Sequence, residues 1–320
     1  MTQLYFAPLE GITDAIFRRV HHEHFGGVDK YFIPFVSPTQ NLTFNHRELH
    51  AIAPELNEGV PAVPQLLTRD AGHFRWASEA LRDMGYTEVN LNIGCPSGTV
   101  TAKVKGSGLL REPDVLRELL DGVFAHSALP VSIKTRIGFY DAAEWPSLWE
   151  ILRDYPMHEL IVHPRTRNEF YKGEPHMDTY ALAAETACCP LVYNGNIFAP
   201  ADAEALLAAF PATSALMLGR GLIANPALAQ MLKGGAPLEA DKLRDFIEHL
   251  FCEYRDRHQL SHALGRIRDV MKHTACCFED PAKAVKLFRK ASTEADYRAA
   301  MTLLFSHPLT AAPAYDTRFW

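Results

Sequence analysis

The chain has 320 residues, of which 48% are hydrophobic and 22% are charged, and its formal net charge is −6. This is the composition of an ordinary globular protein, and the acidic balance excludes general nucleic-acid binding by the whole surface. Six cysteines in a chain of this size do not make a disulfide scaffold.

The N-terminus has no basic segment followed by an apolar stretch, and no apolar run is long enough to span a bilayer. We therefore expect a cytoplasmic protein without membrane contact. The adjacent pairs Cys188-Cys189 and Cys276-Cys277 fit no zinc-ligand spacing, so no metal site is expected.

Short apolar runs recur along the first two thirds of the chain and alternate with helical patterns. Helical stretches rich in Ala, Leu and Glu include 72–84, 114–126 and 200–209. The alternation predicts an α/β fold, a (β/α)8 TIM barrel. An open doubly wound sheet is the alternative, but its G-x-G-x-x-G signature is missing after the first run. The eight predicted strands are 4–9, 31–37, 63–67, 88–94, 131–136, 159–165, 191–196 and 215–221.

Beyond residue 237 the pattern becomes entirely helical. The segments 240–257, 263–276, 281–290 and 294–305 all have helical periodicity, and a linker, Gly234-Gly235-Ala236-Pro237, precedes them. We expect two domains: a barrel over 1–236, and a smaller all-helical C-terminal domain over 237–320.

Cys95 follows the predicted strand 88–94 directly, because Gly94 allows a turn and Pro96 stops the strand. Barrel enzymes carry their chemistry at the C-terminal ends of strands. Polar or glycine-rich groups occur at the same position after most other strands, and they suit a planar cofactor with a phosphate tail better than a sugar or a metal. These candidates are Ala7, Pro8 and Leu9, Gln65, Asn92, Lys134, His163, Asn194, Gly195 and Asn196, and Gly219 and Arg220.

Each of these residues also has an ordinary structural interpretation. A single Lys or His at a strand end is more often part of an ion pair, glycines occur in turns, and an isolated cysteine is usually a small buried hydrophobe. The prediction depends on their coincidence, because six strands, in addition to the one that precedes Cys95, end in suitable groups on one face.

Several motifs together resemble the tRNA-dihydrouridine synthases. They occur in that family's order across the barrel, and the helical tail matches its layout. The motifs are APLEGITD at 7–14, NIGCP at 92–96, KTR at 134–136, HPRTR at 163–167, NGNI at 194–197 and LGRG at 218–221. The chain departs from the commonest pattern at Ile33-Pro34-Phe35, Pro164 and Asn196, which leaves the subfamily open.

The resemblance implies a cytoplasmic enzyme that uses FMN and NADPH to reduce the C5–C6 double bond of particular uridines in tRNA. In that reaction a hydride reaches C6 and Cys95 protonates C5, and a thiol with an ordinary pKa near ~8.5 is mostly protonated at neutral pH. Asn92 and Arg165 would position the uracil. The cofactor would be held by Ala7, Pro8, Leu9, Gln65, Lys134, His163, Asn194, Gly195, Asn196, Gly219 and Arg220.

A local basic face in the C-terminal region supports the expectation that the protein binds RNA. Residues 261–290 carry seven Lys or Arg and three Asp or Glu, and Lys283, Lys286 and Lys290 share a helical face, as do Arg268 and Lys272. Lys103 extends the basic character toward Cys95. Taken alone, such a run is usually a solvated helix surface. We expect tRNA as the partner, no protein partner and a monomer.

Three alternatives remain open from the sequence. A flavin barrel enzyme acting on a free pyrimidine, similar to dihydroorotate dehydrogenase, would share the cofactor site but would not need the basic tail. A non-catalytic tRNA-binding protein would bind RNA without a flavin. An aldolase-type barrel would use Lys134 as a Schiff base.

Overall fold

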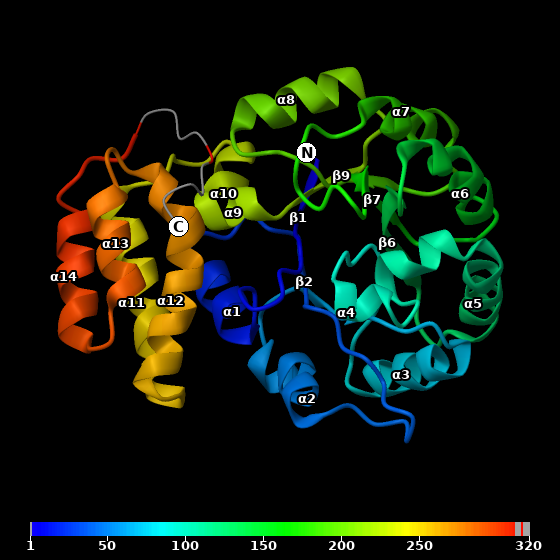
Figure 1. Ribbon diagram of the computed structural model, residues 1–320, viewed down its shortest axis with the longest axis horizontal. Helices are drawn as coiled ribbons and strands as arrows, with labels where there is room; N and C mark the ends of the chain where they lie inside the picture. The colour runs from blue at the N-terminus through cyan, green and yellow to red at the C-terminus, as the bar shows by residue number, and fades with distance from the viewer. Residues whose placement is uncertain (1, 311–314, 316–320) are drawn as a thin grey trace.

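The computed structural model describes residues 2–310 and residue 315. Nine strands form one sheet in which every pairing is parallel, in the order β3-β2-β1-β9-β8-β7-β6-β5-β4. The predicted (β/α)8 barrel is confirmed (Figure 1). The strands are β1 Gln3–Phe6, β2 Lys30–Phe32, β3 Ala62–Val63, β4 Gln65–Leu66, β5 Val89–Ile93, β6 Val131–Gly138, β7 Leu160–Thr166, β8 Leu191–Tyr193 and β9 Ala215–Leu218.

The barrel has eight strand positions, and the ninth strand arises because Pro64 divides the third one. Proline has no backbone N–H to donate to a neighbouring strand. Its carbonyl still accepts a hydrogen bond from Asn90 N at 2.9 Å, and β3 and β4 on either side pair with β2 and β5. The single predicted strand 63–67 is therefore two short strands that together close the barrel.

Helices surround the strands, and the three predicted helical stretches in this region are confirmed to within one residue. Side-chain caps begin two of them: Asp14 accepts from Phe17 N before α1, and Asp70 accepts from His73 N before α3. The helices of this region are α1 Ala15–His24, α2 His46–Ile52, α3 Ala71–Asp83, α4 Gly98–Thr101, α5 Pro113–His126, α6 Trp145–Leu152, α7 Met177–Thr186, α8 Pro200–Ala209, α9 Arg220–Ala224 and α10 Leu228–Leu232. Short 3-10 helices occupy Pro54–Leu56, Gly106–Arg111, Ala142–Glu144 and Ala275–Cys277.

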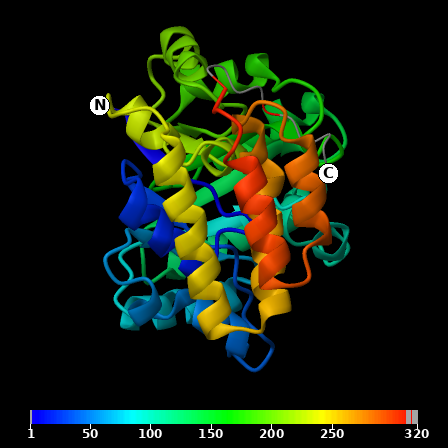
Figure 2. The same cartoon turned by 90° about the vertical axis from the view of Figure 1, so that its left-hand side faces the viewer.

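Four helices make up the C-terminal region and lie together on one side of the barrel (Figures 1 and 2). They confirm the predicted helical tail and are α11 Ala240–Arg257, α12 Leu260–Thr274, α13 Ala282–Lys290 and α14 Glu294–Leu304. Among the described residues, no helix combines the length and apolarity that a bilayer-spanning segment needs.

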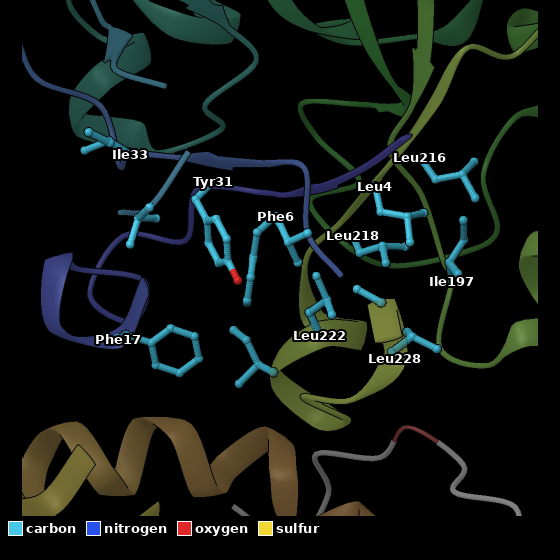
Figure 3. Packing of buried hydrophobic residues seen from close by; sticks show 14 of the residues in the cluster. Leu4, Phe6, Phe17, Tyr31, Ile33, Ile197, Leu216, Leu218, Leu222 and Leu228 are labelled. Carbon is cyan, nitrogen blue, oxygen red and sulfur yellow. The ribbon is translucent and has the colours of Figure 1, made fainter. Parts of the chain in front are cut away.

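The tail helices and the barrel share one continuous hydrophobic core. The ring of Phe246 on α11 lies 5.8 Å from that of Phe17 and 5.2 Å from that of Phe25. Figure 3 shows Phe17 and Phe6 converging with Leu222 in the layer between the strands and the surrounding helices. A separate, smaller core fills the inside of the barrel and includes Tyr5 and Met217.

Candidate active site

One cavity opens at the C-terminal ends of the strands and has a volume of about 270 Å³. Residues within or directly after β1, β2, β4, β5, β6, β7, β8 and β9 line it, so all eight strand positions contribute. Twelve of the residues expected at the site lie in its wall. They are Ala7, Pro8, Leu9, Gln65, Asn92, Cys95, Lys134, His163, Asn194, Gly195, Gly219 and Arg220.

A chain of amides fixes the wall beneath Cys95. Asn92 Nδ2 donates to Gln65 Oε1 at 2.7 Å, and Gln65 Nε2 donates to Asn90 Oδ1 at 2.7 Å. Asn90 Nδ2 in turn donates to Ser132 Oγ at 2.9 Å. Because each amide is held by the next one, the orientations of Gln65 and Asn92 are set before a ligand binds. Each still has one N–H for a ligand edge.

The loop that carries Cys95 is built by side chains as well as by its glycines. Asn92 Oδ1 accepts the backbone N–H groups of Gly94 at 3.0 Å and Cys95 at 2.9 Å, which forms an Asx turn at the end of β5. Ser107 Oγ donates to the Cys95 carbonyl at 2.7 Å. Gly106 has φ +56°, and a Cβ there would lie 3.0 Å from that of Cys95. The thiol is therefore held at a defined place on the lip of the cavity.

The electrostatic environment keeps Cys95 protonated. Burial raises the pKa of the Cys95 thiol, and the nearby cations Arg136 and Lys134 only partly oppose this effect. Burial also lowers the pKa of Lys134, and together with the adjacent positive charge of Arg136 it brings that pKa to about 7. A lysine with such a pKa in a cationic pocket is suited to receive an anionic group.

His163 is a neutral imidazole. Burial, together with the surrounding cations, holds the pKa of His163 well below its usual range. Its Nε2 lies 3.2 Å from Arg165 Nη1, and since a guanidinium can only donate, Nε2 is the acceptor. The hydrogen of the neutral ring is therefore on Nδ1.

Arg165, which was expected to contact the substrate, is fully buried and does not line the cavity. Its Nε donates to the Lys172 carbonyl at 3.2 Å and its Nη2 to the Gly173 carbonyl at 2.6 Å. The side chain holds the loop after β7 against His163, so its position suits the orientation of His163 rather than direct contact with a ligand.

At the other end of the cavity, neighbouring protein atoms lie so close to two residues that only glycine fits there. A Cβ on Gly195 would lie 2.1 Å from the hydroxyl of Tyr193, and one on Gly221 would lie 2.0 Å from the Ile197 carbonyl oxygen. Asn194 Nδ2 donates to the Met217 carbonyl at 2.8 Å, which ties β8 to β9 at this point. Both glycines therefore serve the packing of the segments after β8 and β9, and both line the cavity.

The guanidinium of Arg220 is held among aromatic rings. Its Cζ lies 4.8 Å from the ring centre of Tyr171, 5.7 Å from Phe198 and 5.3 Å from Tyr315. Asn196, also expected at the cofactor site, is not in the cavity wall, but its Oδ1 accepts from Arg220 Nη2 at 3.1 Å. It therefore acts on the cavity through Arg220.

Ten wall residues are missing from the expected set, and Arg136 and Phe198 are two of them. Arg136 lies two residues after Lys134 on β6, so strand alternation, which places both on one face, was a usable signal. Phe198 lies in a loop, and no periodicity predicts its direction. Phe35 and Tyr171 also line the cavity.

The expected RNA-contacting residues lie outside the cavity and differ in accessibility. Lys103 is exposed on the loop after α4, and Lys272, Lys283, Lys286 and Lys290 are exposed on α12 and α13. Arg268 is half-buried and donates to the Ala291 carbonyl at 3.4 Å. Arg266, in the same basic segment, pairs instead with Asp14 at 3.0 Å and fastens α12 to the barrel.

A group with metal-ligand chemistry lies at the opposite, N-terminal end of the barrel. It consists of Glu88, His158 and Glu159. Lys30 Nζ lies 2.6 Å from Glu88 and 2.5 Å from Glu159, so an ammonium already pairs with both carboxylates. The group is a structural ion pair at the closed end of the barrel.

Comparison with known proteins gives results at two levels. A sequence model of the dihydrouridine synthase (Dus) family matches residues 5–306. The probable tRNA-dihydrouridine synthase of Staphylococcus aureus (strain COL) is 34% identical over 230 residues, which are 69% of this chain and 68% of that protein. tRNA-dihydrouridine synthase B of Pasteurella multocida (strain Pm70) is 28% identical over 232 residues, 72% of this chain and 69% of that one. Morphinone reductase has a similar fold, with a TM-score of 0.52 at 13% identity over 75% of this chain and 87% of its own.

Proposed function

The chain belongs to the dihydrouridine synthase family, and from this premise we propose that it reduces the C5–C6 double bond of particular uridines in tRNA, with FMN as cofactor and NADPH as reductant. The observation that carries the proposal is the placement of the protonated Cys95 thiol in the same cavity as Lys134, Arg136 and Arg220.

The charge of the cavity fits an anionic cofactor. Lys134, Arg136 and Arg220 line it, whereas among the described residues Glu10 is the one carboxylate in its wall and is paired with Arg47 at 2.5 Å. The glycines at 195, 219 and 221 line the cavity and could present backbone N–H groups to a phosphate, and Arg220 supplies a charge-assisted donor.

The bound flavin would supply a hydride to C6 of the uracil. Cys95 would transfer its proton to C5, which completes the saturated bond and leaves a thiolate that solvent reprotonates. Lys134 and Arg136, whose charges already favour the thiolate, would stabilise Cys95 after that transfer. His163, neutral and protonated on Nδ1, would donate one hydrogen bond into the cavity rather than a positive charge.

Positioning of the uracil would fall to Asn92, whose free N–H is next to the Cys95 loop. Arg165 would act as a positioning residue through His163 and the loop after β7.

We further propose that the barrel, residues 1–236, performs the reduction and that the tail, residues 237–320, contacts the tRNA through Lys272, Lys283, Lys286 and Lys290, with Arg268 and Lys103 at the edges. These cations are suited to phosphates of a folded RNA. A tRNA substrate is consistent with a cytoplasmic monomer.

Two measurements on the purified protein test the proposal. Bound FMN should give the absorbance of a flavin, and tRNA from cells lacking the gene should reoxidise the NADPH-reduced protein and gain dihydrouridine. Reoxidation by free uracil or orotate, but not by tRNA, would favour the free-pyrimidine alternative. A colourless protein that binds tRNA would favour the non-catalytic one.

A further inference from the structure

Two exposed aromatic side chains stand on adjoining loops at the barrel mouth. Tyr140, after β6, is 62% exposed, and Phe170, after β7, is 41% exposed. The backbones of the two loops are joined, since Arg167 N donates to the Gly138 carbonyl at 2.9 Å and Asn168 N donates to the Phe139 carbonyl at 3.2 Å. The rings are therefore carried on one connected piece of backbone.

This piece is fastened to the loop that carries Cys95. Arg136 donates to the Gly94 carbonyl at 3.0 Å through Nε, and to the Phe170 carbonyl at 2.8 Å through Nη1. Arg167 Nε donates to the Pro96 carbonyl at 3.2 Å. The exposed rings therefore keep a fixed position relative to the thiol.

Cations alternate with the rings along this edge. Arg111 Cζ lies 5.1 Å from the ring centre of Phe139, and Arg167 Cζ lies 5.2 Å from both Phe139 and Phe170. Phe139 in turn contacts Tyr140, with ring centres 4.6 Å apart. Guanidinium groups that alternate with aromatic faces suit a chain in which flat bases alternate with phosphates.

Nearby acidic groups are engaged within the loops. Glu144 accepts the backbone N–H groups of Phe139 and Tyr140 at 2.7 and 2.9 Å, and Asp141 accepts that of Ala143 at 2.8 Å. Glu169 is bonded to His176 at 2.6 Å. These carboxylates are used in shaping the loops, whereas Glu112 lies 3.6 Å from Arg111 Nε and partly offsets the charge of that arginine.

The backbone conformation of Phe170 is consistent with a function for its exposed ring. Its φ is +53°, in the left-handed region that bulky side chains rarely adopt. The strained conformation directs a large apolar side chain to solvent rather than into the fold, and strain of this kind gathers at functional sites.

We propose that Tyr140, Phe170, Arg111 and Arg167, which we call the arginine–aromatic rim, bind the unpaired nucleotides that flank the target uridine. This inference rests on the proposed function. A uridine that enters the cavity must leave its stack, so its neighbours lose a stacking partner. Tyr140 and Phe170 replace that partner, while the two arginines take the adjacent phosphates.

The test is the affinity of the flavin-loaded protein for fluorescently labelled tRNA, measured by anisotropy at several salt concentrations. Phe170→Ala and Tyr140→Ala should each weaken binding roughly tenfold, because stacking on a base is lost. The slope of log affinity against log salt should stay at the wild-type value, since no phosphate contact is removed. Tyr140→Phe and Phe170→Trp keep a stacking ring and should restore affinity.

Two further variants separate stacking from damage to the fold. Phe170→Gly removes the ring but suits the positive φ, so it should weaken binding as Phe170→Ala does while the flavin absorbance is retained. Leu49→Ala, on α2, removes a side chain of similar exposure, 43%, and should bind tRNA as the wild type does.

Two outcomes can be distinguished. If the wild-type protein reduces tRNA but a Tyr140→Ala/Phe170→Ala double variant binds tRNA with unchanged affinity, the proposed role of the arginine–aromatic rim is wrong and the proposed function stands. A wild-type protein that holds flavin yet leaves tRNA unreduced would overturn the proposed function, and the rim with it.

Discussion

The proton on Cys95 is controlled by two opposing effects. Burial favours the neutral thiol, and Arg136 and Lys134 favour the thiolate, with burial prevailing. The thiol thus holds its proton at neutral pH, while the same cations lower the cost of releasing it to a substrate carbon. Such a balance suits an acid better than a nucleophile.

Replacing Cys95 with Ala should slow reoxidation of the reduced protein by tRNA by about 10²–10⁴-fold, the range expected for loss of a general acid. Flavin absorbance should be retained, because the thiol contributes little to cofactor binding. Cys252→Ala, which changes a half-buried cysteine on α11, is the matched control. An unchanged rate in Cys95→Ala would mean that the proton comes from another group.

Lys134 should make cofactor binding depend on pH. With its pKa lowered to about 7, the flavin-free protein loses this charge as the pH rises above neutrality. An anion favours the protonated lysine, so FMN affinity should fall by up to about tenfold per pH unit between roughly pH 7 and 9. The raised pKa of Cys95 and the lowered pKa of His163 keep both groups from titrating near pH 7. Quenching of FMN fluorescence measures the affinity, and in Lys134→Met this dependence should disappear.

Among the single elements, α9 can begin where it does because Gly221 in its first turn has no side chain. A Cβ at Gly221 would meet the Ile197 carbonyl oxygen at 2.0 Å, and a backbone atom cannot move aside cheaply. Gly221→Ala should lower the free energy of unfolding by about 1–3 kcal/mol. Gly265, inside α12, has open space around it, so Gly265→Ala should raise that free energy by about 0.5–1 kcal/mol. Urea unfolding measures the free energy of unfolding of both variants. If Gly221→Ala were no less stable than Gly265→Ala, α9 would be able to shift and make room for the added methyl group.

The exposed lysines of α13 should determine part of the salt dependence of tRNA binding. Changing Lys283, Lys286 and Lys290 together to Gln removes three phosphate contacts, so the slope of log affinity against log salt should fall by about 2–3. Lys233→Gln, which removes an ion pair with Asp29 away from this face, should leave the slope at its wild-type value. An unchanged slope in the triple variant would show that these lysines of α13 do not contact the RNA.

The sequence predicts elements better than it predicts the directions of loop side chains. Periodicity and turn residues were enough for the barrel and the four tail helices, because strand and helix faces must be apolar where they pack. The break in the third strand was missed, because 63–67 was predicted as one strand although Pro64 within it has no N–H to continue a ladder. The burial of Arg165 was not predictable, because it depends on carbonyls of Lys172 and Gly173 in an irregular loop.

For the whole molecule, the central feature is the core shared by barrel and tail. Phe246 on α11 is fully buried against the rings of Phe17 and Phe25 on the barrel side. On α12, Thr274 Oγ1 donates to the Ile223 carbonyl at 2.7 Å. From contacts of this kind we expect the two regions to unfold as one cooperative unit.

Phe246→Ala should therefore destabilise both regions by about 3–5 kcal/mol, the usual cost of such a buried cavity. In urea, the release of the flavin, followed by the rise in its fluorescence, and the loss of helical circular dichroism should shift together to lower urea concentration. Leu287→Ala, at an exposed position on α13, should shift neither signal. A flavin transition that stays in place while the helical signal shifts would show that the tail unfolds independently.

The contact between α1 and α11 also limits how such enzymes can be recombined. A tail taken from a relative would bring its own side chains to the surface now formed by Phe17, His21 and Phe25. Chimaeras intended to redirect the enzyme to another transcript should therefore carry α1 together with the tail, so that the side chains packed across this contact remain the ones that fit each other.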